Sequence, residues 1–468
     1  MIRQIARKEF IEIQRDGRFR WTSAAVGSLL IAALLIGWKH YAQADRQIRA
    51  AGVRQRDLWL NTPDRNPHAA AHHGIYVFKP VMPLSAVDAG IDEYAGASFF
   101  LEAHDQNLSQ NKAVEDTTAV QRFGDASAAI TLQTLIPLLI LLLVFPVFAG
   151  EREQGTLRQL ASLGVSRRDL AIGKALGSAG LLMMFLLPAT LIGVLAMWLN
   201  TTHETLAASI PRMLVMALGY LVYFVVFTGL SLIVSAKAPT ARLAFVALIS
   251  FWFINCLVAP RIMADVARHM VRVSTTLEFL QAVDDDKARV PIAERQKRVV
   301  EQLLAQYGVQ KEEDLPVDPL GAHLIEGEKY DSAVYERHIN GLFDAYERQE
   351  RIYNAGAVFA PMLSIQTLSM GLAGADFKQH RRFADAVSAY RLRWLEVLNE
   401  DIFHNRRPGE LSYSRGRDLW EQVPEMNYEP PSLTWVLGNH TRSIAMLGCW
   451  LVAVLVAAPL TLVRIRID

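Results

Sequence analysis

The chain has 468 residues, of which 51% are hydrophobic and 20% charged, with a formal net charge of +1. No stretch combines a basic run with interleaved aromatic residues, which argues against nucleic-acid binding. Long apolar blocks alternate with strongly polar stretches, as is typical of a membrane protein with sizeable soluble parts. Both cysteines, Cys256 and Cys449, lie inside apolar blocks, so we expect no disulfide framework in the polar regions.

The first 20 residues predict a helix that lies in the cytoplasmic membrane interface. Apolar residues recur there at helical spacing, and basic residues occupy the remaining faces. An ordinary juxtamembrane helix with snorkelling lysine and arginine side chains would occupy the same place. The apolar residues concerned are Ile2, Ile5, Ala6, Phe10 and Ile13.

Six segments are long and apolar enough to span a membrane. A bilayer core of ~30 Å needs about 20 mostly apolar residues in a helix. Lysine and arginine gather before the first segment, after the second, after the fourth and after the last. With six spans all these basic segments fall on one side, so the positive-inside rule places both termini in the cytoplasm. The predicted spans are 21–38, 128–149, 170–199, 213–234, 243–260 and 444–463.

The first span could alternatively be a cleaved signal peptide, because Ala42-Gln43-Ala44 resembles a cleavage site. About 20 mainly polar residues precede its apolar core, which is longer than the usual signal-peptide core. We therefore expect an uncleaved anchor in a bacterial inner (plasma) membrane.

Two large extracytoplasmic regions, 39–127 and 261–440, separate the spans. Neither shows sustained strand alternation. The predicted fold is therefore an all-α polytopic membrane protein with two large, mainly helical extracytoplasmic insertions. Helical patterns cover 41–60, 106–128, 261–307, 323–353 and 376–403, and a Pro-rich irregular stretch covers 407–431.

The segment 355–375 is long enough to span but carries four polar residues and Pro361. We interpret it as an amphipathic or partly buried helix of the second extracytoplasmic domain. If it spans the membrane instead, the C-terminus changes sides.

A charged motif follows the second span directly, within the predicted cytoplasmic loop 150–169. Residues 150–160 read GEREQGTLRQL, residues 165–170 read VSRRDL, and Gly173-Lys174 opens the next span. We expect a short helix with a stripe of Leu157, Leu160 and Leu163, then a turn and re-entry into the membrane. Such an element suits docking in a groove of a cytoplasmic partner. A plain positive-inside loop with one helical turn is the alternative.

The pattern E-x-E-x-G-T-L, then V-S-R, then G-K resembles the cytoplasmic loop of ABC-2 type transporter permeases. In that family the equivalent stretch is the coupling helix that seats on the ATPase subunit. The stretch Leu372-Ala373-Gly374-Ala375-Asp376, with His380, Phe383, Tyr390 and Arg391 beyond it, resembles the permeases that carry a DUF3526 region. The residues that the first resemblance implies as ATPase-coupling contacts are Glu151, Arg152, Glu153, Gly155, Thr156, Leu157, Arg167 and Arg168.

The resemblance implies a permease subunit that needs a separate cytoplasmic ABC ATPase and a second permease copy or paralogue. The phosphate-loop pattern G-x-x-x-x-G-K-[ST] is missing, because Gly173-Lys174 is followed by Ala175 and lacks the upstream glycine. We therefore expect no enzyme and no cofactor in this chain, with ATP and Mg bound by the partner ATPase.

The resemblance favours export as the function. We expect membrane lipid to surround the spans. The alternative is a mechanotransmitting or sensory protein, whose extracytoplasmic domains an ATPase drives without substrate crossing the membrane. In either case an extracytoplasmic partner could dock on the outer regions. Polar and small residues in the spans could line a pathway or simply allow helix packing. They are Gly177, Ser178, Thr228, Ser231 and Asn255.

Clustered imidazoles occur once, at His68, His72 and His73. A spacing of four residues puts two of them on one helical face, which is a usable pair of metal ligands. Pro67 precedes them and no cysteine is near, so a solvated loop explains the cluster equally well. We predict no metal site from the sequence and keep these three residues as candidates.

Overall fold

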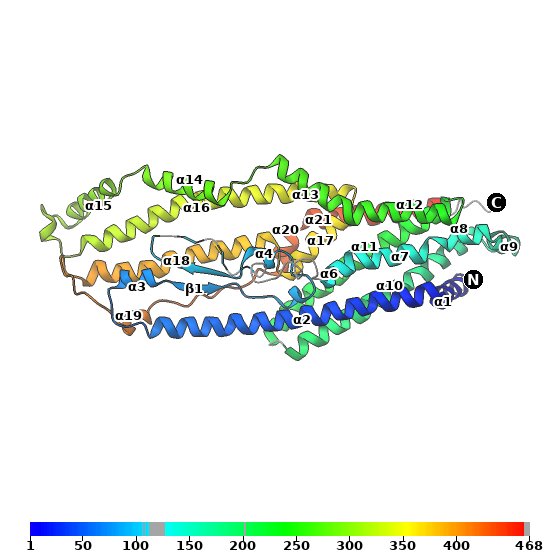
Figure 1. Ribbon diagram of the computed structural model, residues 1–468, viewed down its shortest axis with the longest axis horizontal. Coiled ribbons are helices and arrows are strands. Elements are labelled where there is room, and N and C mark those ends of the chain that lie inside the picture. The colour runs from blue at the N-terminus through cyan, green and yellow to red at the C-terminus, as the bar shows by residue number, and fades with distance from the viewer. Residues whose placement is uncertain (105, 108, 111, 113–126, 201–202, 463–468) are drawn as a thin grey trace.

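The protein is an elongated, mainly helical molecule whose long helices run along its main axis (Figure 1). One end carries α1 (Ile2–Arg15), α8 (Pro146–Glu153) and α9 (Thr156–Ser162). The other end carries α15 (Ile292–Tyr307) and α19 (Arg417–Trp420). The structure is a computed structural model and describes residues 1–104, 106–107, 109–110, 112, 127–200 and 203–462.

Five helical stretches are long and apolar enough to cross a membrane; four contain a predicted span, and the fifth covers residues 444–462 of the predicted span 444–463. The sixth predicted span, 170–199, lies in α10 (Arg167–Asn200), where the described residues give only the shorter apolar stretch Leu186–Leu195. Six spans therefore remain a prediction. The five stretches are Phe19–Leu60, Ala128–Glu153, Thr205–Lys237, Ala241–Met270 and Thr441–Leu462.

Large apolar side chains are exposed along these stretches, for example Leu35, Leu218, Phe253 and Leu455. A water-soluble monomer rarely shows such an extended apolar surface, whereas a protein embedded in a membrane exposes apolar side chains to the lipid. The helices that form the stretches are α2 (Gly17–Leu60), α6 (Ala128–Ile130), α7 (Ile136–Val144), α8, α11 (His203–Lys237), α12 (Ala241–Phe253), α13 (Ala259–Met270) and α21 (Thr441–Leu462). Two π-helical turns interrupt them, η3 (Thr131–Leu135) and η4 (Ile254–Val258).

Helix α2 is much longer than a membrane span. Its 44 residues correspond to about 65 Å, so it continues from the predicted span through the predicted helix 41–60 without a break. Trp59, near its outer end, packs edge-on against Trp394 and Trp420, with ring centroids 5.7 and 5.3 Å away. The indole of Trp59 also donates to the Trp420 carbonyl at 3.0 Å. One continuous helix thus joins the predicted span to the residues around Trp394 and Trp420.

The described parts of the two predicted insertions share one hydrophobic core and form one domain, which we call the outer domain after its predicted extracytoplasmic position. Phe99 from the first region contacts Phe383 from the second, with ring centroids 5.8 Å apart. Trp394, Leu398 and Trp420 are fully buried in the same core. The sequence does not reveal this joint core, because the two regions are more than 100 residues apart.

The described chain is mainly helical, consistent with the all-α expectation, although the first region is less helical than predicted. Strands β1 (Ile75–Phe78) and β2 (Ser98–Leu101) pair antiparallel, with Ile75 opposite Leu101. Short elements surround them: α3 (Pro67–His73), η1 (Pro83–Ala86) and α4 (Asp92–Ala95). Most of the predicted helix 106–128 lies outside the described residues.

The second region follows the predicted helical pattern with one correction. The predicted helix 261–307 is three helices, α13, α14 (Thr276–Ala288) and α15. A capping box between Thr275 and Glu278 starts α14, and Pro291 precedes α15, where it cannot continue a helix that began before it. The remaining elements are η5 (Glu312–Asp314), α16 (Pro319–Ala355), η6 (Gly356–Val358), α18 (Phe377–Asn405) and α20 (Leu433–Asn439).

The ambiguous segment 355–375 contains α17 (Pro361–Ala373), a helix of 13 residues. Nearly all its residues are buried, and it packs against α11 and α21. A helix of this length is too short to cross a bilayer. Because α11 and α21 carry predicted spans, the assignment of this helix to the second extracytoplasmic domain stays a prediction.

Candidate functional site

The predicted coupling motif forms the turn between α8 and α9 at the end of the molecule that carries the N-terminus (Figure 1). Gly155 makes the turn with φ 72°, a left-handed conformation that favours glycine. The hydroxyl of Thr156 donates to the Glu151 carbonyl at 3.1 Å. Leu157 is buried beneath the turn. Backbone conformation and one buried leucine therefore fix how α9 leaves α8.

Three charged side chains from separate segments meet beneath this turn. Lys174 Nζ on α10 lies 2.6 Å from Glu9 Oε2 and 2.9 Å from Glu151 Oε1. The Lys174 and Glu9 side chains are only 2% and 6% exposed. Burial raises the pKa of Glu9, and the ammonium of Lys174 opposes that shift. The Lys174 ammonium is thus enclosed between two carboxylates.

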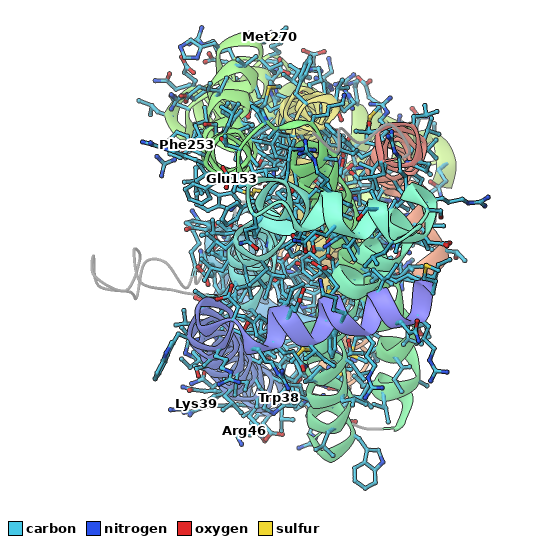
Figure 2. All side chains as sticks on the ribbon, turned by 90° about the vertical axis from the view of Figure 1, so that its right-hand side faces the viewer. Trp38, Lys39, Arg46, Glu153, Phe253 and Met270 are labelled. Carbon is cyan, nitrogen blue, oxygen red and sulfur yellow. The ribbon has the colours of Figure 1, made fainter. Side chains whose placement is uncertain are left out.

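Helix α1 packs directly on α10, over a stripe of three glycines spaced by four and three residues. Seen from this end, α1 lies across the view while α2 runs away from the viewer (Figure 2). The glycines leave room for the α1 backbone to approach. An added Cβ would lie 2.6 Å from Ile5 at Gly173, 2.6 Å from Glu9 at Gly177 and 3.0 Å from Phe10 at Gly180.

The two other charges of the motif contact the connection between α11 and α12. Arg152 donates to the carbonyls of Ala238 and Ala236 at 2.5 and 2.7 Å, at the C-terminus of α11. Glu153 accepts from the backbone N–H of Ala241 at 3.2 Å, at the N-terminus of α12. A cation at a helix C-terminus and an anion at an N-terminus both complement the helix dipoles. Together with the ion pair between Glu151 and Lys174, these bonds connect the motif to α10, α11 and α12.

The outward face of the turn consists of other residues. Leu163 follows α9 with 78% of its surface exposed, and Gly164 with φ 80° shapes the next turn. Arg167 and Arg168 are exposed at the start of α10. Glu153, Gln154, Arg158, Gln159 and Ser162 are exposed on the same element. The predicted stripe of three leucines therefore divides into buried Leu157, half-buried Leu160 and exposed Leu163.

The five residues considered for a pathway are all buried inside the chain. Gly177 lies under α1, and Ser231 donates to the Phe227 carbonyl at 2.7 Å. Asn255, on the π-helical turn η4, interacts with Cys256 and with the Met362 backbone N–H. Ser178 and Thr228 are also enclosed. These positions support the packing alternative, and a pathway lined by them stays a prediction.

Sequence reasoning missed a polar cluster among the apolar helices. Gln133, on the π-helical turn η3, donates to Tyr220 at 3.0 Å, and Tyr220 shares a hydrogen bond with Ser369 of α17. Tyr223 donates to the Gln133 carbonyl at 2.9 Å. The signal available was an amide inside a continuous apolar block.

Glu9 was also missed, although the sequence marks it. It lies four residues after Ile5 and four before Ile13, on the face that the apolar residues of α1 define. A carboxylate on such a face needs a cation in the neighbouring element.

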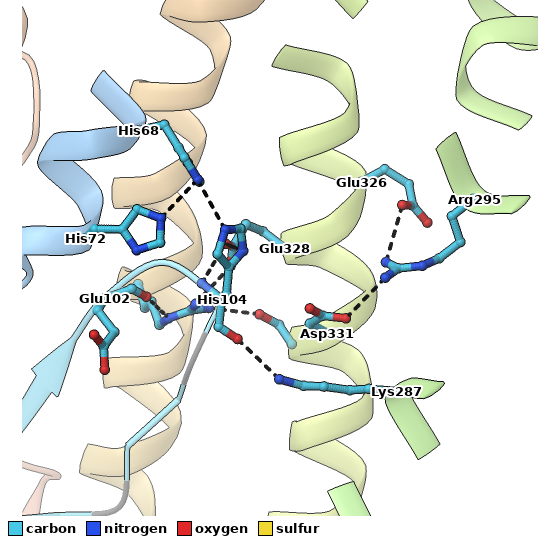
Figure 3. A network of polar contacts seen from close by, with 11 residues as sticks. His68, His72, Glu102, His104, Lys287, Arg295, Glu326, Glu328 and Asp331 are labelled. Carbon is cyan, nitrogen blue, oxygen red and sulfur yellow. Dashed lines mark hydrogen bonds and ion pairs between the residues drawn. The ribbon is translucent and has the colours of Figure 1, made fainter. Parts of the chain in front are cut away.

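The histidine candidates are only partly brought together. His68 and His72 lie on α3 and meet His104 from the loop after β2, whereas His73 is exposed outside the cluster. Figure 3 shows the three rings pointing toward one another. Helix α3 begins because Asn66 accepts hydrogen bonds from the His68 and Ala69 backbone N–H groups, so these histidines are not in a solvated loop.

Comparisons with known proteins confirm both resemblances. The ABC-2 family transporter protein family matches residues 98–256, which include the turn between α8 and α9. A domain of unknown function, DUF3526, matches residues 276–429 of the outer domain. No curated protein matches the chain. The first match supports a permease of an ABC transporter, which is a membrane component and not the ATPase itself.

Proposed function

For a chain that carries both an ABC-2 family transporter region and a DUF3526 region, we propose the following function. It is the permease subunit of an ATP-driven exporter in a bacterial inner membrane. A separate cytoplasmic ABC ATPase binds and hydrolyses ATP with Mg, and a second permease copy or paralogue completes the pathway. Both termini are cytoplasmic, and the outer domain faces away from the ATPase.

The observation that carries the proposal is the connectivity of the turn between α8 and α9. Glu151 contacts Lys174 on α10, Arg152 contacts the end of α11, and Glu153 contacts the start of α12. A displacement of this turn therefore acts at once on three neighbouring helices. Coupling requires such a contiguous set of contacts.

In the proposed mechanism the motif has an inner and an outer part. Glu151, Arg152 and Glu153 transmit the movement, while Gly155, Thr156 and Leu157 fix the shape of the turn. Exposed Leu163, together with Arg167 and Arg168, provides the contact with the ATPase. An exposed leucine flanked by charges suits a groove with an apolar floor and a polar rim.

The test is affinity purification of the full chain from its native membranes in a mild detergent. We expect an ABC ATPase to co-purify with the wild type and to be lost with Leu163→Asp. Leu163 is exposed, so this change should leave the melting temperature of the permease unaltered. Arg3→Glu, an exposed change on α1 at the same end, is the matched control and should retain the ATPase.

Two outcomes would reject the proposal. One is the absence of any ATPase from the wild-type preparation. The other is equal recovery of the ATPase with wild type and Leu163→Asp, which would move the contact away from this turn.

A second function is favoured by the continuous 44-residue helix α2. A rigid helix that joins the membrane part to the outer domain could carry ATPase-driven movement outward without passage of a substrate. Two Gly-Gly insertions distinguish the functions, one after Ala44 in α2 and one beside Gly409 in the loop after α18. If movement along α2 is the function, only the first insertion abolishes ATP-dependent distance changes between spin labels on the outer domain and α10.

A further inference from the structure

The outer domain contains a cluster of three imidazoles that the proposed function does not use. His68 and His72 lie one turn apart on α3, and His104 lies in the loop after β2 (Figure 3). The Nε2 atom of His68 is 3.1 Å from Nε2 of His104 and 3.2 Å from Nε2 of His72. The ligand atoms of all three rings lie within 4.8 Å of one another.

His104 is held in place by contacts from several elements. Its φ of 64° is the only positive value among the described non-glycine residues. Glu328 Oε1 on α16 accepts from the His104 backbone N–H at 2.8 Å, and Lys287 on α14 donates to the His104 carbonyl at 3.2 Å. Two residues earlier, the carbonyl of Glu102 accepts from Arg391 at 2.9 Å. A non-glycine residue keeps a left-handed backbone conformation only where surrounding contacts hold it. These hydrogen bonds therefore fix the position of His104.

In this orientation, Nε2 of His104 faces the His68 and His72 rings. Nδ1 of His104 lies 2.9 Å from Glu328 Oε1, so its proton is directed to the carboxylate and Nε2 keeps its lone pair. Glu328 is itself buried and paired with Arg391 Nη2 at 2.8 Å. Metal-ligating histidines commonly donate their second N–H to such a carboxylate.

Buried polar atoms without hydrogen bonds accompany the imidazole cluster. Among the described residues, His68 Nδ1 and both amide atoms of Asn399 make no hydrogen bond, although they are buried. Coordination through Nε2 would place the His68 proton on Nδ1, where the amide oxygen of Asn399 can accept it. Asn399 lies on α18, and its side chain neighbours the His68 imidazole.

We propose that His68, His72 and His104 bind a divalent first-row transition-metal cation through their three Nε2 atoms, with Zn²⁺ as the ion of best fit. For Zn–N bonds of 2.0–2.1 Å in a tetrahedron the ligand atoms are about 3.3 Å apart, close to the observed 3.1 and 3.2 Å. Imidazole suits zinc, copper and nickel better than calcium or magnesium. His72 is exposed, so the fourth coordination position of the metal would face solvent. Sites with such an open position can exchange a bound ligand.

The test uses the full chain in detergent, purified with a tag that contains no histidine and stripped with a chelator. Zn²⁺ is titrated in competition with a chromophoric chelator, and Co²⁺ is added separately to detect the absorption of tetrahedral coordination. We expect one Zn²⁺ per chain and a tetrahedral Co²⁺ spectrum. His68→Gln, His72→Gln and His104→Gln should each weaken Zn²⁺ binding at least tenfold.

The decisive comparison is His72→Gln against His73→Gln. The two residues are adjacent and both exposed on α3, so neither change disturbs folding, but only His72 belongs to the cluster. Equal Zn²⁺ affinity in these two variants, or no Zn²⁺ bound by the wild type, would overturn the proposal. The result is independent of ATPase co-purification, because the site lies in the outer domain.

Glu328 acts in this site as a positioning residue. Glu328→Gln keeps an acceptor oxygen for His104 but removes the charge, and outer-shell changes of this kind weaken metal binding about 10–100-fold. Excess Co²⁺ should restore the tetrahedral spectrum in this variant. If excess Co²⁺ does not restore the tetrahedral spectrum, the role of Glu328 is structural only.

Discussion

Lys174 on α10 holds Glu9 on α1 through a buried ion pair, with 2.6 Å between Nζ and Oε2. The same ammonium reaches Glu151, next to the turn between α8 and α9, at 2.9 Å. The N-terminal helix, the turn and α10 are thereby joined at one cation. The first three predictions concern this end of the molecule.

Lys174→Met should strongly destabilise the protein, because it leaves the carboxylates of Glu9 and Glu151 without their buried cation. Removing one partner of a buried pair costs about 3–5 kcal/mol. Lys8→Met is the matched control: Lys8 also contacts Glu151, but its side chain is 48% exposed, so about 1 kcal/mol or less is expected. Thermal unfolding in detergent measures both, and equal losses would contradict the assigned role of Lys174.

Gly177→Ala should displace α1 from α10. The added Cβ would lie 2.6 Å from Glu9 Cβ and 2.8 Å from the Ala6 carbonyl oxygen, which is backbone and cannot rotate away. Overpacking of this kind costs about 1–3 kcal/mol, and amide exchange in α1 should accelerate. Gly448→Ala in α21 meets no atom within 4 Å and should leave both measurements unchanged or slightly improved. Unaltered exchange in α1 of Gly177→Ala would refute the close packing.

Arg152→Ala should loosen the connection between α11 and α12. It removes two hydrogen bonds from a charged donor to the carbonyls of Ala236 and Ala238, and such bonds contribute about 1.5–3 kcal/mol each. Hydrogen exchange of residues 236–241 should therefore increase. Arg167→Ala, at the exposed start of α10, is the control and should not affect these amides. Protection equal to wild type in Arg152→Ala would show that the turn does not hold α11.

The docking of the outer domain on the last span should weaken at low pH through Asp376. Burial alone would raise the pKa of Asp376, but hydrogen bonds from His440 and Gln379 outweigh it and lower the pKa. A carboxyl with a lowered folded pKa stabilises the fold above its unfolded pKa of about 4. That stability is lost as pH falls through the lower folded pKa. Other charged or titratable groups that interact with Asp376 are Asp92, Arg212, Glu350 and Tyr428.

Melting temperatures between pH 6 and pH 3 check this expectation. The wild type should lose stability below about pH 4, whereas Asp376→Asn should be less stable at pH 6 and lose less on acidification. Parallel decreases in the two proteins would assign the acid sensitivity to other groups.

The sequence predicts well whatever depends on neighbouring residues. Apolar length located the five helical stretches, the predicted helix 323–353 lies within α16, and the predicted helix 376–403 begins at Asp376, the residue that caps α18. The predicted coupling motif is a local pattern, because its glycine, threonine and leucine form one turn. These features follow from hydrophobic burial and backbone preferences over about 20 residues.

Only the tertiary structure decided which distant groups meet. Glu9 and Lys174 are 165 positions apart, and the sequence offers each of them many partners of opposite charge. His104 replaces His73 in the imidazole cluster because the pairing of β1 with β2 and the contact with Glu328 bring its loop to α3. Which distant residues pair depends on how whole helices pack against one another. Packing requires complementary surfaces, and a local sequence pattern does not show which surfaces fit together.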